Sequence, residues 1–320
     1  MNKLYPWLGP LWQQWQLSLE ADRFSNATLL LAKEGMGADQ LVEKFSRAVM
    51  CSNYASDACG FCHSCQLMQS HNHPDFHIVK PEKEGKNITV DQIRQCTRLA
   101  QESSQLSGYR IIIIEPAEAM NESAANALLK TLETPAEKCL FLLIATGMSS
   151  LLPTITSRCQ QWHLTAPEDT QLVNWLAEQT SKPVPAYAAH INGYAPLTTL
   201  AFIEQGDADR FQMITDQFVA SLKLQGDMVK LAKDLASDSG QQLEWLWYSL
   251  TDAQKYHFGM RLPDATPCAS VLANVLDYSL LYTQTQALTG LIEQLNQHSG
   301  LNKELLILDW LFKFDGETCL

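Results

Sequence analysis

No apolar run in this sequence is long enough to cross a membrane, and no segment is of low complexity. Apolar stretches such as IIII at 111–114 are far shorter than the roughly 18 residues that a membrane-spanning helix needs. Residues 1–15 lack the apolar core of a secretory signal. Hydrophobic residues make up 46% of the chain and charged residues 18%, the balance of an ordered globular protein. We therefore expect a cytoplasmic protein with no membrane partner.

Positive charge is scarce. The chain has 23 Lys and Arg residues against 35 Asp and Glu residues, which gives a net charge of −12. Proteins that grip nucleic acid through its phosphates usually present a basic face, so tight, direct DNA binding is not expected. Nine cysteines in a chain without a secretory signal indicate reduced thiols or bound metal rather than disulfides.

A phosphate-binding loop at 29–40, LLLAKEGMGADQ, lacks the residues that hold phosphate. Gly35 and Gly37 follow an apolar run and precede a helical pattern, which is the strand–loop–helix context of a P-loop. A working loop would place Lys at position 38 and Ser or Thr at 39, but this chain has Ala38 and Asp39. The pattern predicts a chain shaped like an NTPase that does not grip nucleotide. The simpler alternative is an ordinary glycine-containing turn.

The second motif of an NTPase site, which follows the third strand, is also altered. In an NTPase of this architecture, Asp-Glu follows the third strand; the Asp holds Mg²⁺ and the Glu activates water. Here the apolar strand at 110–114 is followed by Glu115 and Pro116. Glu115 could replace the metal-holding acid, but Pro116 cannot activate water. We expect the two altered loops to follow adjacent strands. Lys33 precedes both glycines and is therefore on the wrong side to replace the missing cation.

Four cysteines, Cys51, Cys59, Cys62 and Cys65, form a C-x7-C-x2-C-x2-C pattern. Zn²⁺ takes four thiolate or imidazole ligands in a tetrahedron, and each C-x2-C turn directs two sulfurs at one ion. Gly60 gives the backbone the freedom that such a turn needs. Four thiolates leave no open position for water or substrate, so we predict one structural zinc. No Lys or Arg occurs between 51 and 79, which argues against a nucleic-acid-binding zinc module.

Strand-like and helix-like segments alternate in the first half of the chain and then stop. Alternation of this kind predicts a parallel sheet covered on both faces. We therefore expect an α/β P-loop domain at 1–165 carrying the cysteine insert at 51–65. After it we expect a small helical domain at 166–207 and an all-α domain at 208–320. The expected strands are 28–32, 76–79, 110–114, 139–145 and 160–164, and the clearest helices are 39–50, 90–101, 122–132 and 169–179.

Arg158 lies in the segment TITSRC at 154–159, just before the last expected strand. Its planar, permanently charged guanidinium suits the γ-phosphate of a nucleotide held by a neighbouring subunit. The alternative is a surface arginine in a structural ion pair. Its position relative to the two altered loops favours the functional interpretation.

Together these features resemble the AAA+ clamp-loader subunits of bacterial DNA polymerase III, and among them the delta-prime type. The resemblance spans the chain, and the missing Lys at 38 separates this type from the sister ATPase subunits. The segments that carry it are YPWL at 5–8, AKEGMGAD at 32–39, GFCHSCQLM at 60–68, HPDFHIVKPEK at 73–83, AANALLKTLETP at 124–135, TITSRC at 154–159 and LNKELLILDWL at 301–311.

The resemblance implies an AAA+ domain with a helical lid and a C-terminal collar that joins five subunits in a ring. It implies a stator that does not hydrolyse ATP, with Arg158 acting in trans as an arginine finger on ATP held by a neighbouring ATPase subunit. The implied partners are the gamma/tau ATPase subunits and delta, and indirectly the sliding clamp and primed DNA. By resemblance, Lys130 and Glu133 lie near the subunit interface. The stretch 192–197 carries no basic nucleotide sensor, in agreement with an unused site.

Two other functions stay open on the sequence alone. One is an active clamp-loader ATPase with an unorthodox loop, which would bind ATP by itself. The other is a zinc-containing nucleic-acid-binding protein, which would bind DNA in a salt-dependent way without partners. The altered loops weigh against the first, and the charge of −12 weighs against the second.

Overall fold

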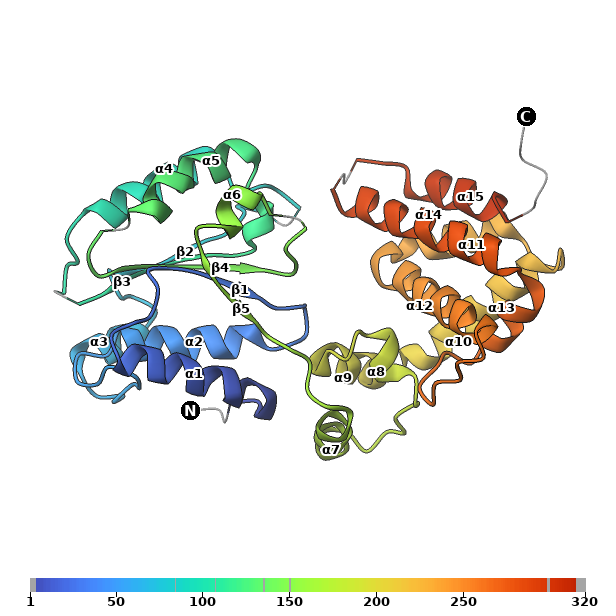
Figure 1. The fold of residues 1–320 in the computed structure, drawn as a ribbon, viewed down its shortest axis with the longest axis horizontal. Helices are drawn as coiled ribbons and strands as arrows, with labels where there is room; N and C mark the ends of the chain where they lie inside the picture. Colours follow the sequence, from blue (N-terminus) through green and yellow to red (C-terminus); the bar gives the residue numbers. More distant parts are fainter. Residues whose placement is uncertain are drawn as a thin grey trace. The chain divides into compact units, whose positions relative to one another are not determined.

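A computed structural model describes residues 4–83, 85–106, 108–134, 136–149, 151–297 and 300–314. Its chain divides into two compact units, Met1–Ala166 and Pro167–Leu320 (Figure 1). Pro135 of the segment 124–135 and residues 315–320 of the expected C-terminal domain lie outside the described residues. Among the described helices, none is both long enough and apolar enough to span a membrane.

The first unit is built on a five-stranded parallel sheet in the order β2-β3-β4-β1-β5. Every residue of the strands β1, β3 and β4 is buried, so these strands read as continuous apolar runs rather than alternating ones. The strands are β1 (Ala27–Leu31), β2 (Phe76–Val79), β3 (Arg110–Ile114), β4 (Cys139–Ala145) and β5 (Gln160–His163).

Helices cover both faces of this sheet (Figure 1). One face carries α1 (Gly9–Glu20), α2 (Ala38–Val49) and α3 (His63–Gln69), and the other carries α4 (Val90–Gln101), α5 (Glu122–Glu133) and α6 (Pro153–Thr156). On the α4–α5 face, apolar side chains one turn apart pack on alternate strand residues in one buried cluster. The α/β fold class predicted from the sequence is confirmed.

The order of the strands corrects one expectation. The two altered loops follow β1 and β3, and β4 lies between these strands, so the strand ends are not adjacent. The helix α1 and the short helices α3 and α6 of the first unit were not predicted from the sequence. The first helix nevertheless buries Leu11, Trp12 and Trp15, at the spacing of one helical face.

The second unit is entirely helical in its described residues. It comprises α7 (Asp169–Gln179), α8 (Ala188–Ile191), α9 (Pro196–Gln205), α10 (Asp207–Leu222), α11 (Met228–Ser237), α12 (Ser239–His257), α13 (Ala269–Val275), α14 (Tyr278–Gln297) and α15 (Lys303–Phe312). His190 on α8 lies 3.0 Å from the carboxylate of Asp252 on α12, and both side chains are buried. This pair joins the segments expected as lid and collar, whose division into separate domains stays a prediction.

Candidate functional site

The altered phosphate loop joins a buried strand to a helix through two glycines. It leaves β1 at Leu31 and enters α2 at Ala38. Gly35 and Gly37 have φ values of 76° and 72°, in the left-handed region that favours glycine. Gly37 is also the residue that caps the start of α2. The strand–loop–helix context is therefore present, and what is altered is the side-chain chemistry.

The N-terminal segment packs against this loop, a contact that the sequence analysis missed. The indole Nε1 of Trp7 donates a hydrogen bond of 2.8 Å to the carbonyl oxygen of Met36, between the two loop glycines. The backbone N–H of Tyr5 donates to Oε1 of Gln40 in the first turn of α2, at 3.1 Å. Tyr5 and Trp7 stack on each other with ring centroids 4.9 Å apart. These contacts tie the loop to the N-terminal segment, which belongs to neither β1 nor α2.

Charge at the start of α2 is negative. Asp39 is exposed in the first turn of the helix, where a carboxylate interacts favourably with the helix dipole. A nucleotide phosphate would occupy the same positive end of the helix in a working loop. Asp39 therefore repels the anion that Lys and Ser or Thr would bind, and Ala38 supplies no cation.

The second altered loop is engaged in an ion pair and in hydrogen bonds of its own. Glu115 lies 3.1 Å from Nζ of Lys80, which follows β2. Nearby, Glu118 accepts hydrogen bonds from the hydroxyl of Thr146 at 2.6 Å and from its backbone N–H at 3.0 Å. The acid that could replace the metal-holding residue is thus paired with a lysine instead.

Arg158 forms an ion pair with Glu133, the last residue of α5. Its Nη2 and Nε lie 2.5 and 2.8 Å from Oε1 of Glu133. Its Nη1 donates to the carbonyl oxygen of Thr154 at 2.9 Å. The side chains of Arg158 and Glu133 are 31% and 50% exposed. The arginine is therefore both paired and accessible, and its role toward a neighbouring subunit stays a proposal.

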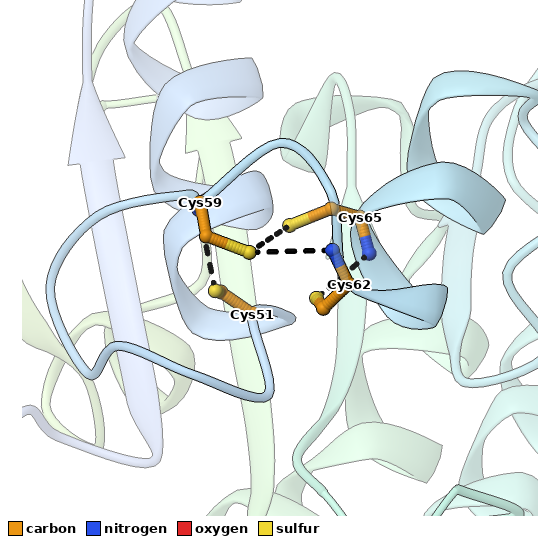
Figure 2. A group of neighbouring side chains, drawn as sticks. All are labelled: Cys51, Cys59, Cys62 and Cys65. Atoms are coloured by element: carbon orange, nitrogen blue, oxygen red, sulfur yellow. Dashed lines mark hydrogen bonds between the residues drawn. The ribbon is translucent and has the colours of Figure 1, made fainter.

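The four predicted cysteines come together (Figure 2). Their sulfurs all lie within 4.8 Å of one another, and those of Cys59 and Cys65 are 3.9 Å apart. A tetrahedral zinc with Zn–S distances of ~2.3 Å needs sulfurs about 3.8 Å apart. Cys51 follows the end of α2, Cys62 caps α3, and Gly60 turns the chain between them with φ 79°. The residues fit a closed four-thiolate metal site.

Backbone N–H groups within the cluster donate to three of the four sulfurs. The backbone N–H groups of Cys59, Cys62 and Cys65 donate to the sulfurs of Cys51, Cys59 and Cys62, each at 3.4 Å. Burial raises the pKa of Cys62, but hydrogen bonds from the backbone N–H groups of Cys65 and Ser52 and from the side chains of Cys65 and Cys59 outweigh it and lower the pKa to about 6. Burial and the neighbouring sulfurs of Cys62 and Cys51 raise the pKa of Cys65 to about 12. A cation at the centre of the cluster would stabilise all four sulfurs as thiolates. The four cysteines could therefore hold a metal ion.

A chain of hydrogen bonds runs from the cysteine insert to the sheet. Ser64, between two of the cysteines, donates to the carbonyl oxygen of Met50 and contacts Nε2 of His73 at 2.8 Å. The other ring nitrogen of His73 accepts from the backbone N–H of Asp75 at 3.1 Å. Asp75 then pairs with Arg110, the first residue of β3. The insert is thus anchored on buried polar groups rather than on a core of its own.

Two family models match this chain. One described as "DNA polymerase III, delta subunit" covers residues 8–168, and its C-terminal counterpart covers residues 204–316. The curated protein DNA polymerase III subunit delta' of Haemophilus influenzae is 31% identical over 99% of both chains. The proteins of the same name from Escherichia coli and Pseudomonas aeruginosa are 33% identical over 97% of this chain and 95% of theirs, and 37% identical over 70% and 69%.

The chain belongs to the delta-prime family of DNA polymerase III subunits. The relationship extends over nearly the whole chain, so both units belong to the family architecture. A solved gamma subunit-related protein of Thermotoga maritima is similar at 16% identity with a TM-score of 0.41, covering 95% of this chain and 98% of its own. Likeness at that level adds nothing to the assignment.

Proposed function

We propose that this delta-prime family member is a clamp-loader subunit that does not hydrolyse ATP itself. It supplies Arg158 in trans to ATP held by a neighbouring ATPase subunit. The observation that carries the proposal is that the same chain has an altered phosphate loop and a partly exposed arginine. The loop has Gly35 and Gly37 in the left-handed region but carries Ala38 and Asp39, whereas the side chain of Arg158 is 31% exposed.

The chemistry follows from charge. As the γ-phosphate is transferred, negative charge develops on its oxygens, and a positioned guanidinium stabilises it. An arginine finger of this kind raises the rate of hydrolysis by ~10³-fold or more. The nucleotide and its Mg²⁺ stay on the neighbouring subunit. The contribution of this chain is therefore to the rate of hydrolysis and not to the affinity for ATP.

The partners follow from the same assignment. We place the chain in a ring of five subunits with the gamma/tau ATPase subunits and delta, which loads the sliding clamp on primed DNA in the bacterial cytoplasm. The helical second unit provides a collar surface for this assembly. Direct DNA contact is not required of this chain, in agreement with its charge of −12.

The cysteine cluster holds one zinc ion in this proposal. Cys51, Cys59, Cys62 and Cys65 would be its ligands, and the ion would close the insert between α2 and α3. A site of four thiolates leaves no position for a reacting water. The zinc would therefore stabilise the fold and take no part in catalysis.

Calorimetry of ATP binding to the purified chain, alone and with the ATPase subunits, tests the proposal. We expect no heat of binding to the isolated chain. In the reconstituted loader, Arg158→Ala should lower ATP turnover at the neighbouring ATPase subunit by ~10³-fold with an unchanged KM for ATP. Arg158→Lys should retain only part of the wild-type turnover, because lysine lacks the planar fork of the guanidinium. The matched control is Arg94→Ala, which removes an exposed arginine from a surface pair with Asp91.

Two results would overturn the proposal. Micromolar binding of ATP to the isolated chain would mean that the altered loop works without its lysine. Unchanged ATPase turnover with Arg158→Ala, in a loader that assembles normally, would mean that the arginine is a structural surface residue.

A further inference from the structure

The guanidinium of Arg158 is held at three of its atoms. Nε and Nη2 both donate to Oε1 of Glu133, and Nη1 donates to the carbonyl oxygen of Thr154. A guanidinium carries five N–H groups, two of them on Nη2. Since Glu133 accepts one of these two, the other N–H of Nη2 has no acceptor among the described residues. The arginine is therefore fixed in place and still has a donor to offer.

Both anchors belong to rigid parts of the first unit. Glu133 ends α5, whose preceding turn buries Thr131 and Leu132 against the sheet. Thr154 lies in α6, which buries Ile155 and Thr156. An arginine held by acceptors on two helices samples fewer rotamers than a free arginine on a surface.

The ion pair is placed where it adds little to the stability of the fold. Exposed ion pairs contribute little, and this one is 31% and 50% exposed. A carboxylate at the C-terminal end of a helix also opposes the helix dipole, which favours a cation there. Glu133 by itself is therefore unfavourable at the end of α5. The positive charge of Arg158 compensates both the carboxylate and the negative end of the helix dipole.

We propose that Glu133 is a positioning residue that holds the guanidinium of Arg158 in the orientation that meets the γ-phosphate of the neighbouring subunit. The proposal rests on the proposed function of Arg158 as an arginine finger. Glu133 itself touches no substrate. It removes the need to order the arginine during the reaction, and a donor that is already ordered stabilises developing charge most effectively.

The test measures steady-state ATPase of the reconstituted loader with variants of this chain. Glu133→Ala should lower kcat at the neighbouring ATPase subunit by about tenfold and leave its KM for ATP unchanged, because that subunit and not this chain binds the nucleotide. Glu133→Gln keeps an acceptor oxygen for Nε and Nη2 and should restore kcat to within about threefold of wild type. In the Arg158→Ala background, Glu133→Ala should have no further effect, because its only route to catalysis has been removed. Glu137→Ala, an exposed glutamate just after α5, is the matched control.

The kcat values of Glu133→Ala and Arg158→Ala test the positioning role of Glu133 and the arginine finger separately. A rise in kcat with Glu133→Ala would show that the glutamate restrains the arginine and would overturn the inference. Unchanged kcat with Glu133→Ala, while Arg158→Ala still lowers it, would overturn the inference and leave the arginine finger standing. Unchanged kcat with both variants would overturn the proposed function as well. A melting temperature of Glu133→Ala equal to that of wild type excludes a loss of folding as the cause.

Discussion

Asp75 and Arg110 form an ion pair inside the first unit, with Oδ1 and Nη2 2.8 Å apart and the side chains 1% and 3% exposed. Arg110 also donates to the carbonyl oxygens of Leu99, Glu102 and Ser103, where α4 ends. Asp75 accepts from the backbone N–H groups of Gln105 and Leu106. One buried guanidinium thus joins β3, the loop before β2 and the end of α4. Because Asp75 also bonds to His73, the same pair supports the cysteine insert.

Removing the cation alone should be strongly destabilising. Burial raises the pKa of Asp75, but the N–H of Gln105 and the guanidinium of Arg110 outweigh it and hold the pKa below its usual value. Arg110→Met would leave a buried charge without its partner and lower the free energy of unfolding by about 3–5 kcal/mol. Urea denaturation followed by circular dichroism measures this change.

A second substitution separates charge from packing. Asp75→Asn in the Arg110→Met background should regain part of the lost stability, because no charge is then buried. Arg94→Met, on the exposed face of α4, should change stability by less than about 0.5 kcal/mol. Equal stabilities of Arg110→Met and wild type would contradict the prediction.

His77 on β2 should make the stability depend on pH. Burial lowers the pKa of His77, and the positive charge of Arg110 lowers it further. Its Nε2 is buried and has no hydrogen-bond partner among the described residues. Below pH ~6.5, the ordinary value, the unfolded chain binds a proton here that the folded chain resists. The stabilisation is therefore complete above that pH and is lost as the pH falls through the folded pKa.

The comparison of wild type with His77→Phe between pH 7.5 and 5.5 isolates this effect. Phenylalanine fills a similar volume and does not titrate. With saturating zinc in both samples, the wild type should lose more free energy of unfolding on acidification than the variant does. Parallel pH profiles of the two proteins would show that His77 does not contribute.

Loss of one cysteine ligand should release the metal. Native protein should contain about one zinc ion per chain, measured by elemental mass spectrometry. Cys62→Ser should lower the zinc affinity by more than the ~10–100-fold that is typical of losing an outer hydrogen-bond partner of a site. Stability should fall with it, because the energy of metal binding is folding energy.

Cys159→Ala is the matched control for the metal site. This cysteine is buried in the apolar cluster on the α4–α5 face and lies outside the four-cysteine cluster. The variant should keep its zinc. A native protein without metal, with stability unchanged by Cys62→Ser, would contradict the zinc assignment.

Local patterns in the sequence predicted most of the first unit. The bounds of β2, β3, β4 and α4 were predicted to the residue, because short apolar runs and amphipathic helices carry their own periodicity. The cysteine cluster was predicted for a similar reason, since its ligands lie within one short segment. These features depend on neighbours along the chain.

Contacts between distant segments were not predictable in this way. The position of β4 between β1 and β3 depends on how crossovers pack, which no local pattern records. Arg158 and Glu133 are 25 residues apart, and no local pattern in either segment indicates that the two side chains are in contact. The bond from Trp7 to Met36 spans 29 residues and fixes the altered loop from the N-terminal segment. Such pairs determine what the site can do, and they became visible only in the fold.

Restoring the missing side chains should restore nucleotide binding without hydrolysis. Ala38→Lys combined with Asp39→Thr removes a repelling carboxylate and adds the cation and hydroxyl of a working loop. The backbone already turns at Gly35 and Gly37 in the left-handed region, between β1 and α2. Charge-assisted hydrogen bonds worth ~1.5–3 kcal/mol each should bring the Kd for Mg-ATP to about 1 mM or tighter.

Ala38→Met combined with Asp39→Thr is the control for this variant, because methionine extends the side chain without a charge. It should bind no ATP, whereas the lysine variant gives a measurable heat in calorimetry. Neither variant should hydrolyse ATP, since Pro116 stands where the sequence analysis expects the water-activating residue and Glu115 is paired with Lys80. If the lysine variant binds no ATP at millimolar concentration, the loss of function does not lie in these two side chains. The fastening of the loop by Trp7 would then be the feature that excludes nucleotide.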